Sequence, residues 1–369
     1  MKTYRVGGSV RDELLGLPVQ DHDYVVVGSD PAEMVRLGYK PVGADFPVFL
    51  HPETHEEYAL ARTERKTGPG YKGFSFHAAP DVTLEQDLGR RDLTINAMAL
   101  DGEGQLIDPY GGQHDLRAGI LRHVGEAFAE DPVRILRVAR FAARFGFSIA
   151  PETLALMRRM VEQGEANALV AERVWQELAR GLMEREPSRM VAALRECGAL
   201  ARVLPEIDAM FDAPEVPERL AARVDHSATR NFSLPVRYAA LVLDLVSRTA
   251  EALAARINAP NDCREVAHAA IRDRSLLVSA ETLDADTLLA VLERCDAFRR
   301  PERLERLIEV AECDVLAESA ESFKGGACLR RAAAAARGID AGAVARANPD
   351  DVPGAVRRAR LVAIADLQR

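Results

Sequence analysis

The sequence feature that most constrains the fold is a pair of glycines, Gly7 and Gly8, that ends a short alternating stretch. Tyr4 and Val6 alternate with polar neighbours, which is the pattern of a single strand. Glycines let the backbone turn sharply and come close to a ligand. Ser9 can cap the helix that follows, and the exposed backbone N–H groups of such a helix start form an anion site. The pattern therefore predicts a strand, a turn and a helix arranged around a bound anion.

A second strand is predicted from Asp23 to Val27, a β-branched and aromatic run that ends at Gly28. Asp21 and Asp23 lie two residues apart, so on a strand they share one face, with Cα atoms roughly 6.5–7 Å apart. Mg2+ takes oxygen ligands and bridges protein carboxylates to substrate phosphates. Two such ions can activate a hydroxyl group and stabilise a leaving oxygen in phosphoryl transfer. Arg11, in the first turn of the predicted helix, could reach a phosphate there.

Taken singly, each of these signals also has a purely structural interpretation. Most glycine pairs only reverse the chain, and most Asp-x-Asp pairs mark a solvated strand end or a turn. Glu57, in a predicted strand over residues 57–62, could add a third carboxylate, but a solvent-facing position is the simpler expectation. The spacing of the two motifs together is what favours a phosphate and metal site.

Composition indicates a largely helical protein of two or more domains. The chain has 369 residues and only 5% aromatics, and it is rich in alanine, arginine and leucine. The net charge of −9 argues against non-specific coating of nucleic acid, although it is compatible with a local basic face. No run of 18 apolar residues and no leader sequence is present, which predicts a soluble, cytoplasmic protein.

The cysteines indicate free thiols rather than a disulfide framework or a zinc site, because no C-x-x-C pair occurs. They are Cys197, Cys263, Cys295, Cys313 and Cys328.

The first 110 residues contain the remaining strand signals. The expected elements are strands at 46–50, 57–62 and 106–112 and a helix at 31–37 capped by Asp30. Residues 63–80 are rich in glycine, proline and basic side chains, which predicts a mobile loop. Its Arg65, Lys66 and Lys72 could close over phosphates, or the segment is an ordinary solvated connection.

Polar side chains in residues 87–99 are predicted to converge on one site. Arg91, Asp92 and Asn96 form this group, while Leu93 and Ile95 pack inward. Arginine binds phosphate with two parallel hydrogen bonds and keeps its charge.

From Glu130 onward the hydrophobic period becomes that of a helix, and helices are expected to the end of the chain. Pro132 suits the first turn of the helix, and Ile135 and Val138 belong to its apolar face. The arginines that share another face, at i, i+3 and i+7, are Arg137, Arg140 and Arg144. Such a stripe is usually only solvated, but its place after the carboxylate region favours a functional role.

Four motifs occur in the order and spacing of class II tRNA nucleotidyltransferases, the CCA-adding enzymes, and the chain resembles the bacterial type most closely. The motifs are Val6–Asp12, Asp21-x-Asp23, Arg90–Ala97 and Glu130-Asp131-x-x-Arg134. The resemblance is strong over residues 1–210 and weak beyond them.

The resemblance implies an α+β fold. A nucleotidyltransferase head with a small, five-stranded mixed sheet is followed by an all-α neck, body and tail. The implied boundaries are 1–129 for the head, 130–206 for the neck and 207–369 for the tRNA-binding body and tail, which include a degenerate HD-like region.

The implied activity is template-independent addition of C, C and A to the 3′ end of tRNA from CTP and ATP. The implied cofactor is Mg2+, and pyrophosphate is released by two-metal nucleotidyl transfer. The implied catalytic and metal-binding residues are Asp21 and Asp23. The implied nucleotide-binding residues are Gly8, Arg11, Arg91, Asp92, Asn96, Asp131, Arg134, Arg137 and Arg140.

The implied reading of the base by Asp131 and Arg134 has a physical rationale. A carboxylate only accepts hydrogen bonds and a guanidinium only donates them. Cytosine and adenine both offer an amino donor beside a ring-nitrogen acceptor, whereas uracil and guanine offer the reverse. Such a pair therefore accepts C and A, and it leaves unpaired polar groups with U or G.

One departure from the family concerns the HD motif, in which adjacent histidine and aspartate residues bind a metal. Here Leu243 stands beside Asp244, and only His226 and His268 remain in the second half. We therefore expect no metal-dependent phosphatase or phosphodiesterase activity. The alternatives to CCA addition are a poly(A) polymerase, an enzyme adding only CC or A, and a non-catalytic RNA-binding protein.

Overall fold

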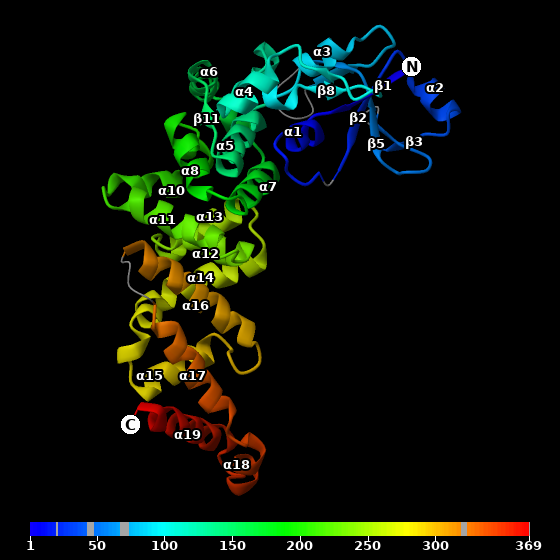
Figure 1. The fold of residues 1–369 in the computed structure, drawn as a ribbon. Coiled ribbons are helices and arrows are strands. Elements are labelled where there is room, and N and C mark those ends of the chain that lie inside the picture. Colours follow the sequence, from blue (N-terminus) through cyan, green and yellow to red (C-terminus); the bar gives the residue numbers. More distant parts are fainter. Residues whose placement is uncertain (20, 43–47, 67–73, 319–322, 369) are drawn as a thin grey trace. The chain divides into compact units, whose positions relative to one another are not determined.

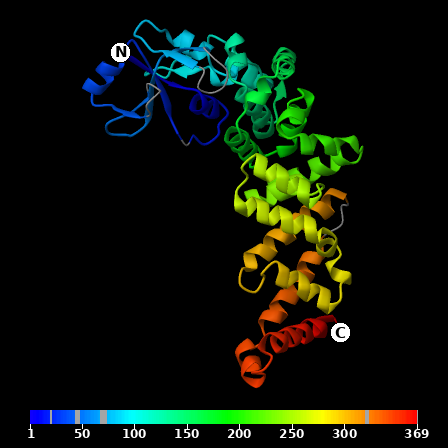
Figure 2. The ribbon, with the colours of Figure 1, turned by 180° about the vertical axis from the view of Figure 1, so that it is seen from behind.

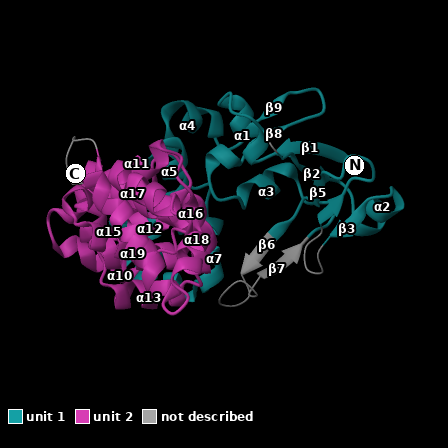
Figure 3. Ribbon diagram, turned by 90° about the horizontal axis from the view of Figure 1, so that it is seen from below, with its two compact units in different colours: residues 1–173, 192–203 teal, residues 174–191, 204–369 magenta. Residues whose placement is uncertain are grey.

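The computed structural model describes residues 1–19, 21–42, 48–66, 74–318 and 323–368, with the backbone alone for 64–66, 74–77 and 318 (Figure 1). These residues form two compact units. Unit 1 comprises residues 1–173 and 192–203, and unit 2 comprises residues 174–191 and 204–369 (Figure 3). The division into head, neck and body at 129/130 and 206/207 stays a prediction.

Unit 1 contains a mixed sheet with the strand order β3-β4-β5-β2-β1-β8-β9. Its strands are β1 (Lys2–Val6), β2 (Asp23–Val27), β3 (Lys40–Val42), β4 (Val48–Leu50), β5 (Glu57–Leu60), β8 (Ala99–Leu100) and β9 (Leu106–Ile107). Strands β2 and β5 are parallel, and the other neighbours are antiparallel. The implied five-stranded sheet is therefore wrong, because the two-residue strands β8 and β9 extend the sheet beyond β1.

The two faces of this sheet bury different apolar clusters, as the period-2 alternation of β2 requires. Val25 packs with Leu88 of α3 (Leu84–Gly89) on one face. Val26 packs with Met34 of α2 (Pro31–Arg36) on the other. The short central strands are thereby covered on both sides.

The remaining elements of unit 1 are mainly helical. They are α1 (Gly8–Leu14), α4 (Gly112–Ala118), α5 (Val133–Phe145), α6 (Pro151–Glu162), α9 (Leu200–Val203), the 3-10 turns η1 (Thr94–Asn96), η2 (Glu126–Glu130) and η3 (Glu165–Ala168), and the short parallel strands β10 (Ile120–Leu121) and β11 (Ser148–Ile149). The helix predicted from Glu130 begins at Val133, because η2 takes up the acidic residues before it. The last predicted strand ends at Ile107, since the chain turns into α4.

Of the two helix caps predicted from the sequence, one is confirmed and one is wrong. Asp30 caps α2 as predicted, since its carboxylate accepts from the backbone N–H of Glu33 at 2.8 Å. The predicted capping role of Ser9 is wrong. Gly7 occupies the N-cap of α1, and the Ser9 hydroxyl donates instead to the Val6 carbonyl at 3.1 Å.

The segment expected as a loop is partly a hairpin. Strands β6 (Thr63–Lys66) and β7 (Phe74–His77) pair antiparallel, with Thr63 opposite His77. Residues 67–73, including Lys72, and the side chains of Arg65 and Lys66 lie outside the description, so their proposed contact with phosphates is not tested.

Unit 2 is helical throughout its described residues. It holds most of α7 (Ala171–Leu182), the start of α8 (Pro187–Glu196), α10 (Pro205–Asp208), α11 (Val216–Thr229), α12 (Leu234–Val242), α13 (Ser247–Arg256), α14 (Asn261–Val278), α15 (Ala285–Arg294), α16 (Pro301–Glu318), α17 (Gly325–Arg337), α18 (Ala341–Ala347) and α19 (Val352–Ala365), with short 3-10 turns η4 (Ala209–Asp212), η5 (Ala280–Thr282) and η6 (Asp366–Gln368). Helix α12 lies at its centre and packs against α11, α14 and α16, and α14 lies beside α16 in both views (Figure 1, Figure 2).

The predicted free thiols are confirmed. All five cysteines are unpaired, and only Cys328 is partly exposed. Across the described ranges, no helix is both long and apolar enough to cross a membrane.

Candidate active site

The two sequence motifs at the start of the chain meet through the pairing of β1 with β2. Val6 is the register partner of Asp23, so the glycine turn follows directly beside the first carboxylate of β2. Gly7 has φ +73°, and a Cβ there would lie 2.7 Å from Nη1 of Arg91. Only glycine combines this backbone conformation with so close an approach of a guanidinium.

A cavity of about 460 Å³ opens beside this turn. Its lining residues are Gly7, Gly8, Arg11, Asp23, Arg90, Arg91, Asp92, Asn96, Asp131, Arg134, Arg137, Phe141 and Arg173. Arginines outnumber aspartates two to one in this lining, so the cavity is strongly positive within a chain of net negative charge. A concave, positively charged surface attracts an anionic ligand such as a nucleoside triphosphate.

A chain of hydrogen bonds fixes the polar side chains in this cavity. Nη1 of Arg11 donates to Oδ1 of Asn96 at 2.5 Å, and Nδ2 of Asn96 donates to Oδ1 of Asp92 at 2.9 Å. Oδ2 of Asp92 accepts from Nε of Arg137 at 2.8 Å. Asp12 extends the chain, because it accepts from both Arg11 and Arg144. The predicted convergence around residues 91–96 is confirmed.

The carboxyl group of Asp92 is held in its ionised form. Burial opposes ionisation, but the charge of Arg137 and the hydrogen bonds from Asn96 and Arg137 outweigh it, and the pKa of Asp92 falls to about 2. Asp92 therefore keeps its negative charge at neutral pH and orients Arg137 at the cavity wall.

Phe141 is the apolar centre of the arginine group. The guanidinium carbons of Arg11, Arg137 and Arg140 lie 5.2, 5.5 and 4.5 Å from the centre of its ring. A ring face attracts cations, so one aromatic side chain stabilises three guanidiniums at once. Phe145 gives Arg11 a second ring contact at 4.9 Å.

A second carboxylate organises the arginines of the opposite wall. Asp87 is fully buried, and it accepts from Arg90 at 2.9 and 3.0 Å and from Arg91 at 3.3 Å. Burial raises the pKa of Asp87, but the two arginines outweigh it, so the pKa is lowered. Arg91 is thereby held across the glycine turn.

The residues implied to read the base lie on one rim of the cavity. Arg134 donates to the Ala127 carbonyl at 2.9 Å and to the Arg90 carbonyl at 2.8 Å, which fixes its guanidinium plane. Each of these terminal nitrogens carries a second hydrogen that can reach a ligand. Asp131 accepts from the Val133 backbone and forms an ion pair with Arg173 at 3.4 Å.

The two carboxylates predicted to bind metal, Asp21 and Asp23, lie at the edge of this cavity. Asp23 begins β2 and lines the cavity, whereas Asp21 precedes the strand and does not. Burial raises the pKa of Asp23, Arg91 lowers it, and the nearby charge of Asp21 raises it further. Two carboxylates beside a cationic phosphate cradle fit a divalent metal ion that completes its coordination with substrate phosphates.

Glu57 lies beside Asp23 in the ladder between β5 and β2, and both line a smaller cavity of about 180 Å³. In the part of the chain that the structure describes, however, no group of three or more His, Cys, Asp or Glu side chains is arranged to hold a metal ion. Glu57 is exposed, which agrees with the solvent-facing position expected from the sequence.

The structure brings nine of the eleven predicted site residues to the cavity. Arg140 does not line it, because its side chain is buried against Phe141, and Asp21 stands outside it. Sequence reasoning did not assign Arg90, Phe141 or Arg173 to the site. For Phe141 a signal existed, since it follows Arg137 by one helical turn.

In unit 2, Asp244 of the HD-like region is paired with arginines. Its carboxylate accepts from Arg219 at 2.8 Å, from Arg223 at 2.6 Å and from Arg274 at 2.9 Å. Leu243 beside it is buried, and His226 contacts Glu312 at 3.2 Å. The expectation that this region has no metal-dependent hydrolase activity stays a prediction.

Two family models match the chain. The model described as "Poly A polymerase head domain" matches residues 3–122, and the one described as "Probable RNA and SrmB- binding site of polymerase A" matches residues 146–211.

Curated relatives match over nearly the whole length. The "Multifunctional CCA protein" of Azoarcus sp. (strain BH72) is 54% identical, covering 100% of this chain and 98% of the relative. The protein of the same name from Nitrosospira multiformis is 53% identical, covering 94% of this chain and 91% of the relative. The similarity to these relatives therefore extends beyond residue 210, whereas the matches to the family models end at residue 211.

Solved structures share the fold. The CCA-adding enzyme of Bacillus stearothermophilus in complex with CTP has a TM-score of 0.72 at 25% identity, covering 99% of this chain and 89% of that one. The Thermotoga maritima CCA-adding enzyme complexed with tRNA has a TM-score of 0.61 at 24% identity, covering 92% and 78%. The α+β head followed by helices is thus confirmed.

Proposed function

The chain belongs to the family of CCA-adding tRNA nucleotidyltransferases, and we propose that it performs this reaction in the cavity of unit 1 that Arg11, Arg91 and Asp23 line. It adds C, C and A to the 3′ end of tRNA from CTP and ATP without a template. We also propose that it acts in the cytoplasm.

The observation that carries this proposal is the group of arginines fixed around Phe141 and Asp92 directly beside Asp23. A nucleotide triphosphate carries its charge on phosphates, and guanidiniums held in place by buried partners do not have to be ordered when it binds. Arg11 is held by Asp12 and Asn96, and Arg91 by Asp87. Together with Gly8 they form the triphosphate side of the site, which Arg137 completes.

The family uses a divalent metal, and we propose Mg2+, held by Asp21 and Asp23. When bound, such ions assist the attacking hydroxyl and stabilise the leaving oxygen. The carboxylate of Asp23 must be ionised to take part. Burial raises the pKa of Asp23, and the neighbouring Arg91 partly offsets that rise. In the reaction, the 3′ hydroxyl oxygen of tRNA forms a bond to the α-phosphorus of the nucleotide, and pyrophosphate leaves.

Asp131 and Arg134 provide the base selection. The carboxylate accepts from the amino group that cytosine and adenine share, and the guanidinium donates to their ring nitrogen. Arg134 is fixed by two backbone carbonyls, so it is already oriented before a nucleotide binds. Arg173 forms an ion pair with Asp131 at 3.4 Å.

The proposal is tested by changing the two carboxylates and following binding and incorporation separately. Asp21→Ala with Asp23→Ala should abolish incorporation of labelled CTP while tRNA binding stays near the wild-type value. A matched control is Glu53→Ala, an exposed carboxylate of the same unit that does not line the cavity. Incorporation that survives the double change would overturn the assignment of the metal site.

A further inference from the structure

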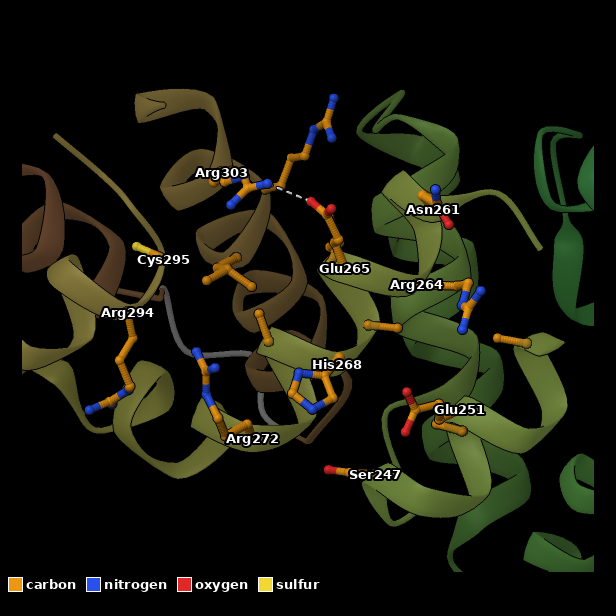
Figure 4. A pocket seen from close by; sticks show the side chains of 17 residues that line it. Ser247, Glu251, Asn261, Arg264, Glu265, His268, Arg272, Arg294, Cys295 and Arg303 are labelled. Carbon is orange, nitrogen blue, oxygen red and sulfur yellow. Dashed lines mark hydrogen bonds and ion pairs between the residues drawn. The ribbon is translucent and has the colours of Figure 1, made fainter. Parts of the chain in front are cut away.

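A second cavity lies entirely within unit 2 and has a volume of about 510 Å³ (Figure 4). Helices α13, α14 and α16 supply most of its lining, and Arg294 and Cys295 at the end of α15 close one side. Its size is that of a pocket for a small organic ligand rather than of a packing defect. Neither family model that matches the chain covers it.

Helix α14 presents a row of basic side chains to this cavity. Arg264, His268 and Arg272 follow one another at i, i+4 and i+8, so they lie along one face of the helix (Figure 4). Each step along the axis is about 6 Å, given a rise of 1.5 Å per residue. The row therefore spans more than one phosphate group.

Positive charge exceeds negative charge around the cavity. Its charged lining consists of Arg264, Arg272, Arg294, Arg303 and Arg306 with Glu251 and Glu265. One of the glutamates, Glu265, forms an ion pair with Arg303 at 2.6 Å, which a dashed line marks in Figure 4. The remaining charge is not balanced within the lining.

A buried carboxylate behind the wall holds two of these arginines in place. Asp273 is almost fully buried, and its two oxygens accept from Arg272 at 2.6 Å and from Arg294 at 2.8 Å. One negative charge thus orients two guanidiniums, and a net positive charge remains at their exposed ends. This is the arrangement that Asp87 makes with Arg90 and Arg91 in unit 1.

The side chains of two further arginines form neither a hydrogen bond nor an ion pair within the described ranges. They are Arg264 on α14 and Arg306 on α16, and both are half-buried. Ala250, Ala254 and Val266 supply an apolar part of the wall. Glu251 is likewise without such a partner and can accept from a hydroxyl or amino group.

We propose that this cavity is a second ligand site, specific for ribose phosphate groups and separate from the nucleotidyl-transfer cavity. The arginines bind phosphate oxygens, which suit their forked donors, and Glu251 accepts from a ribose hydroxyl. Two sources carry this chemistry, a free nucleotide and the backbone of tRNA. The tRNA alternative rests on the proposed function, whereas the free-nucleotide alternative is independent of it.

The test uses the full-length protein with Arg264→Ala and Arg306→Ala combined. Because neither side chain is hydrogen-bonded, the fold should persist, which thermal unfolding checks. Arg346→Ala is the matched control, since Arg346 is an exposed arginine on α18 that does not line the cavity. His268→Glu is a second variant, which introduces a negative charge at an exposed lining position.

Two measurements distinguish the sources. If tRNA is the ligand, the double variant raises the tRNA dissociation constant about tenfold or more and makes its logarithmic salt dependence shallower by about 1.5. If a free nucleotide is the ligand, equilibrium dialysis with ATP gives two sites per wild-type chain and one per variant. Arg264→Lys with Arg306→Lys should retain much of the binding, because the charge is kept.

The proposal is overturned if both measurements on the double variant and on His268→Glu match those on Arg346→Ala. Failure of the proposed function gives a different result. In that case wild-type protein does not incorporate CTP into tRNA, whatever these variants bind.

Discussion

Nε of Arg137 on α5 donates to Oδ2 of Asp92 at 2.8 Å, across 45 positions of sequence. Asp92 also accepts from Asn96, which in turn accepts from Arg11. The ion pair therefore links α5 to the glycine turn at the start of α1. Asp92 therefore orients Arg137 directly and Arg11 through Asn96, while Asp12 also holds Arg11.

Asp92→Asn should destabilise the protein by about 3 kcal/mol at neutral pH, because it leaves the arginine beside a buried neutral group. Chemical denaturation of both proteins measures the difference. Arg158→Ala provides the control, since its ion pair with Glu196 is exposed and should contribute less than about 1 kcal/mol. Equal effects of the two substitutions would contradict the role given to Asp92.

The stability difference between wild type and the same variant should depend on pH. The pKa of Asp92 is about 2 in the folded protein and about 3.9 in an unfolded chain, so folding favours the ionised form. The resulting stabilisation is present above about pH 4 and is lost as the pH falls towards 2. The stability difference between wild type and Asp92→Asn should therefore be constant from pH 5 to 8 and shrink only below about 4. A difference that already declines at pH 6 would contradict it.

Gly7→Ala should reduce incorporation at least a hundredfold, because the new Cβ would lie 2.7 Å from Nη1 of Arg91 and displace it. A misplaced binding group can cost that much in rate. Gly16→Ala is a matched control. Gly16 has φ +68°, and no atom lies within 4 Å of its Cβ position, so it tests backbone strain without the clash. Steady-state rates of CTP incorporation compare the two, and an equal loss in both would assign the effect to strain alone.

Phe141→Leu should raise the KM for CTP and ATP about tenfold and change kcat little. Three guanidiniums lose their ring contact, each worth about 0.5–1 kcal/mol. Phe147→Leu, a change outside the cavity lining, should leave KM unaltered. A fall in kcat without a change in KM would show that Phe141 acts on the reaction step instead.

Asp131→Asn should weaken discrimination against UTP and GTP, because an amide can donate as well as accept. The ratio of UTP to CTP incorporation measures this directly and should rise about tenfold or more. Arg173→Ala removes the ion pair of Asp131 but keeps its carboxylate, so selectivity should remain while KM rises. Unchanged selectivity in Asp131→Asn would remove Asp131 from the base-reading role.

Local patterns predicted the parts of the site that neighbouring residues determine. The strand, glycine turn and helix at the start of the chain, and the strand that begins at Asp23, depend on short-range signals. The same holds for Asp30 at the start of α2. The hairpin of β6 and β7 was missed because its glycine- and proline-containing centre resembles a loop.

Contacts between segments that lie far apart in the sequence could not be predicted from local patterns. Arg173 reaches Asp131 from 42 positions away, and no spacing in the sequence indicates that pairing. Asp244 collects arginines from α11 and α14, which only the packing of unit 2 brings together. Phe141 follows Arg137 by one helical turn, but its ring contact with Arg11 became apparent only from the fold.

The most direct test of the account is incorporation of labelled CTP and ATP, separately and together, into tRNA that lacks its 3′ end, with Mg2+ present. Addition of three nucleotides only when both are supplied is the predicted result. If CTP or ATP alone gives the full product, the protein is an enzyme that adds only CC or only A. A long series of products with ATP alone would indicate a poly(A) polymerase. No incorporation by protein that still binds tRNA would contradict the assignment of an active site to the arginine-lined cavity.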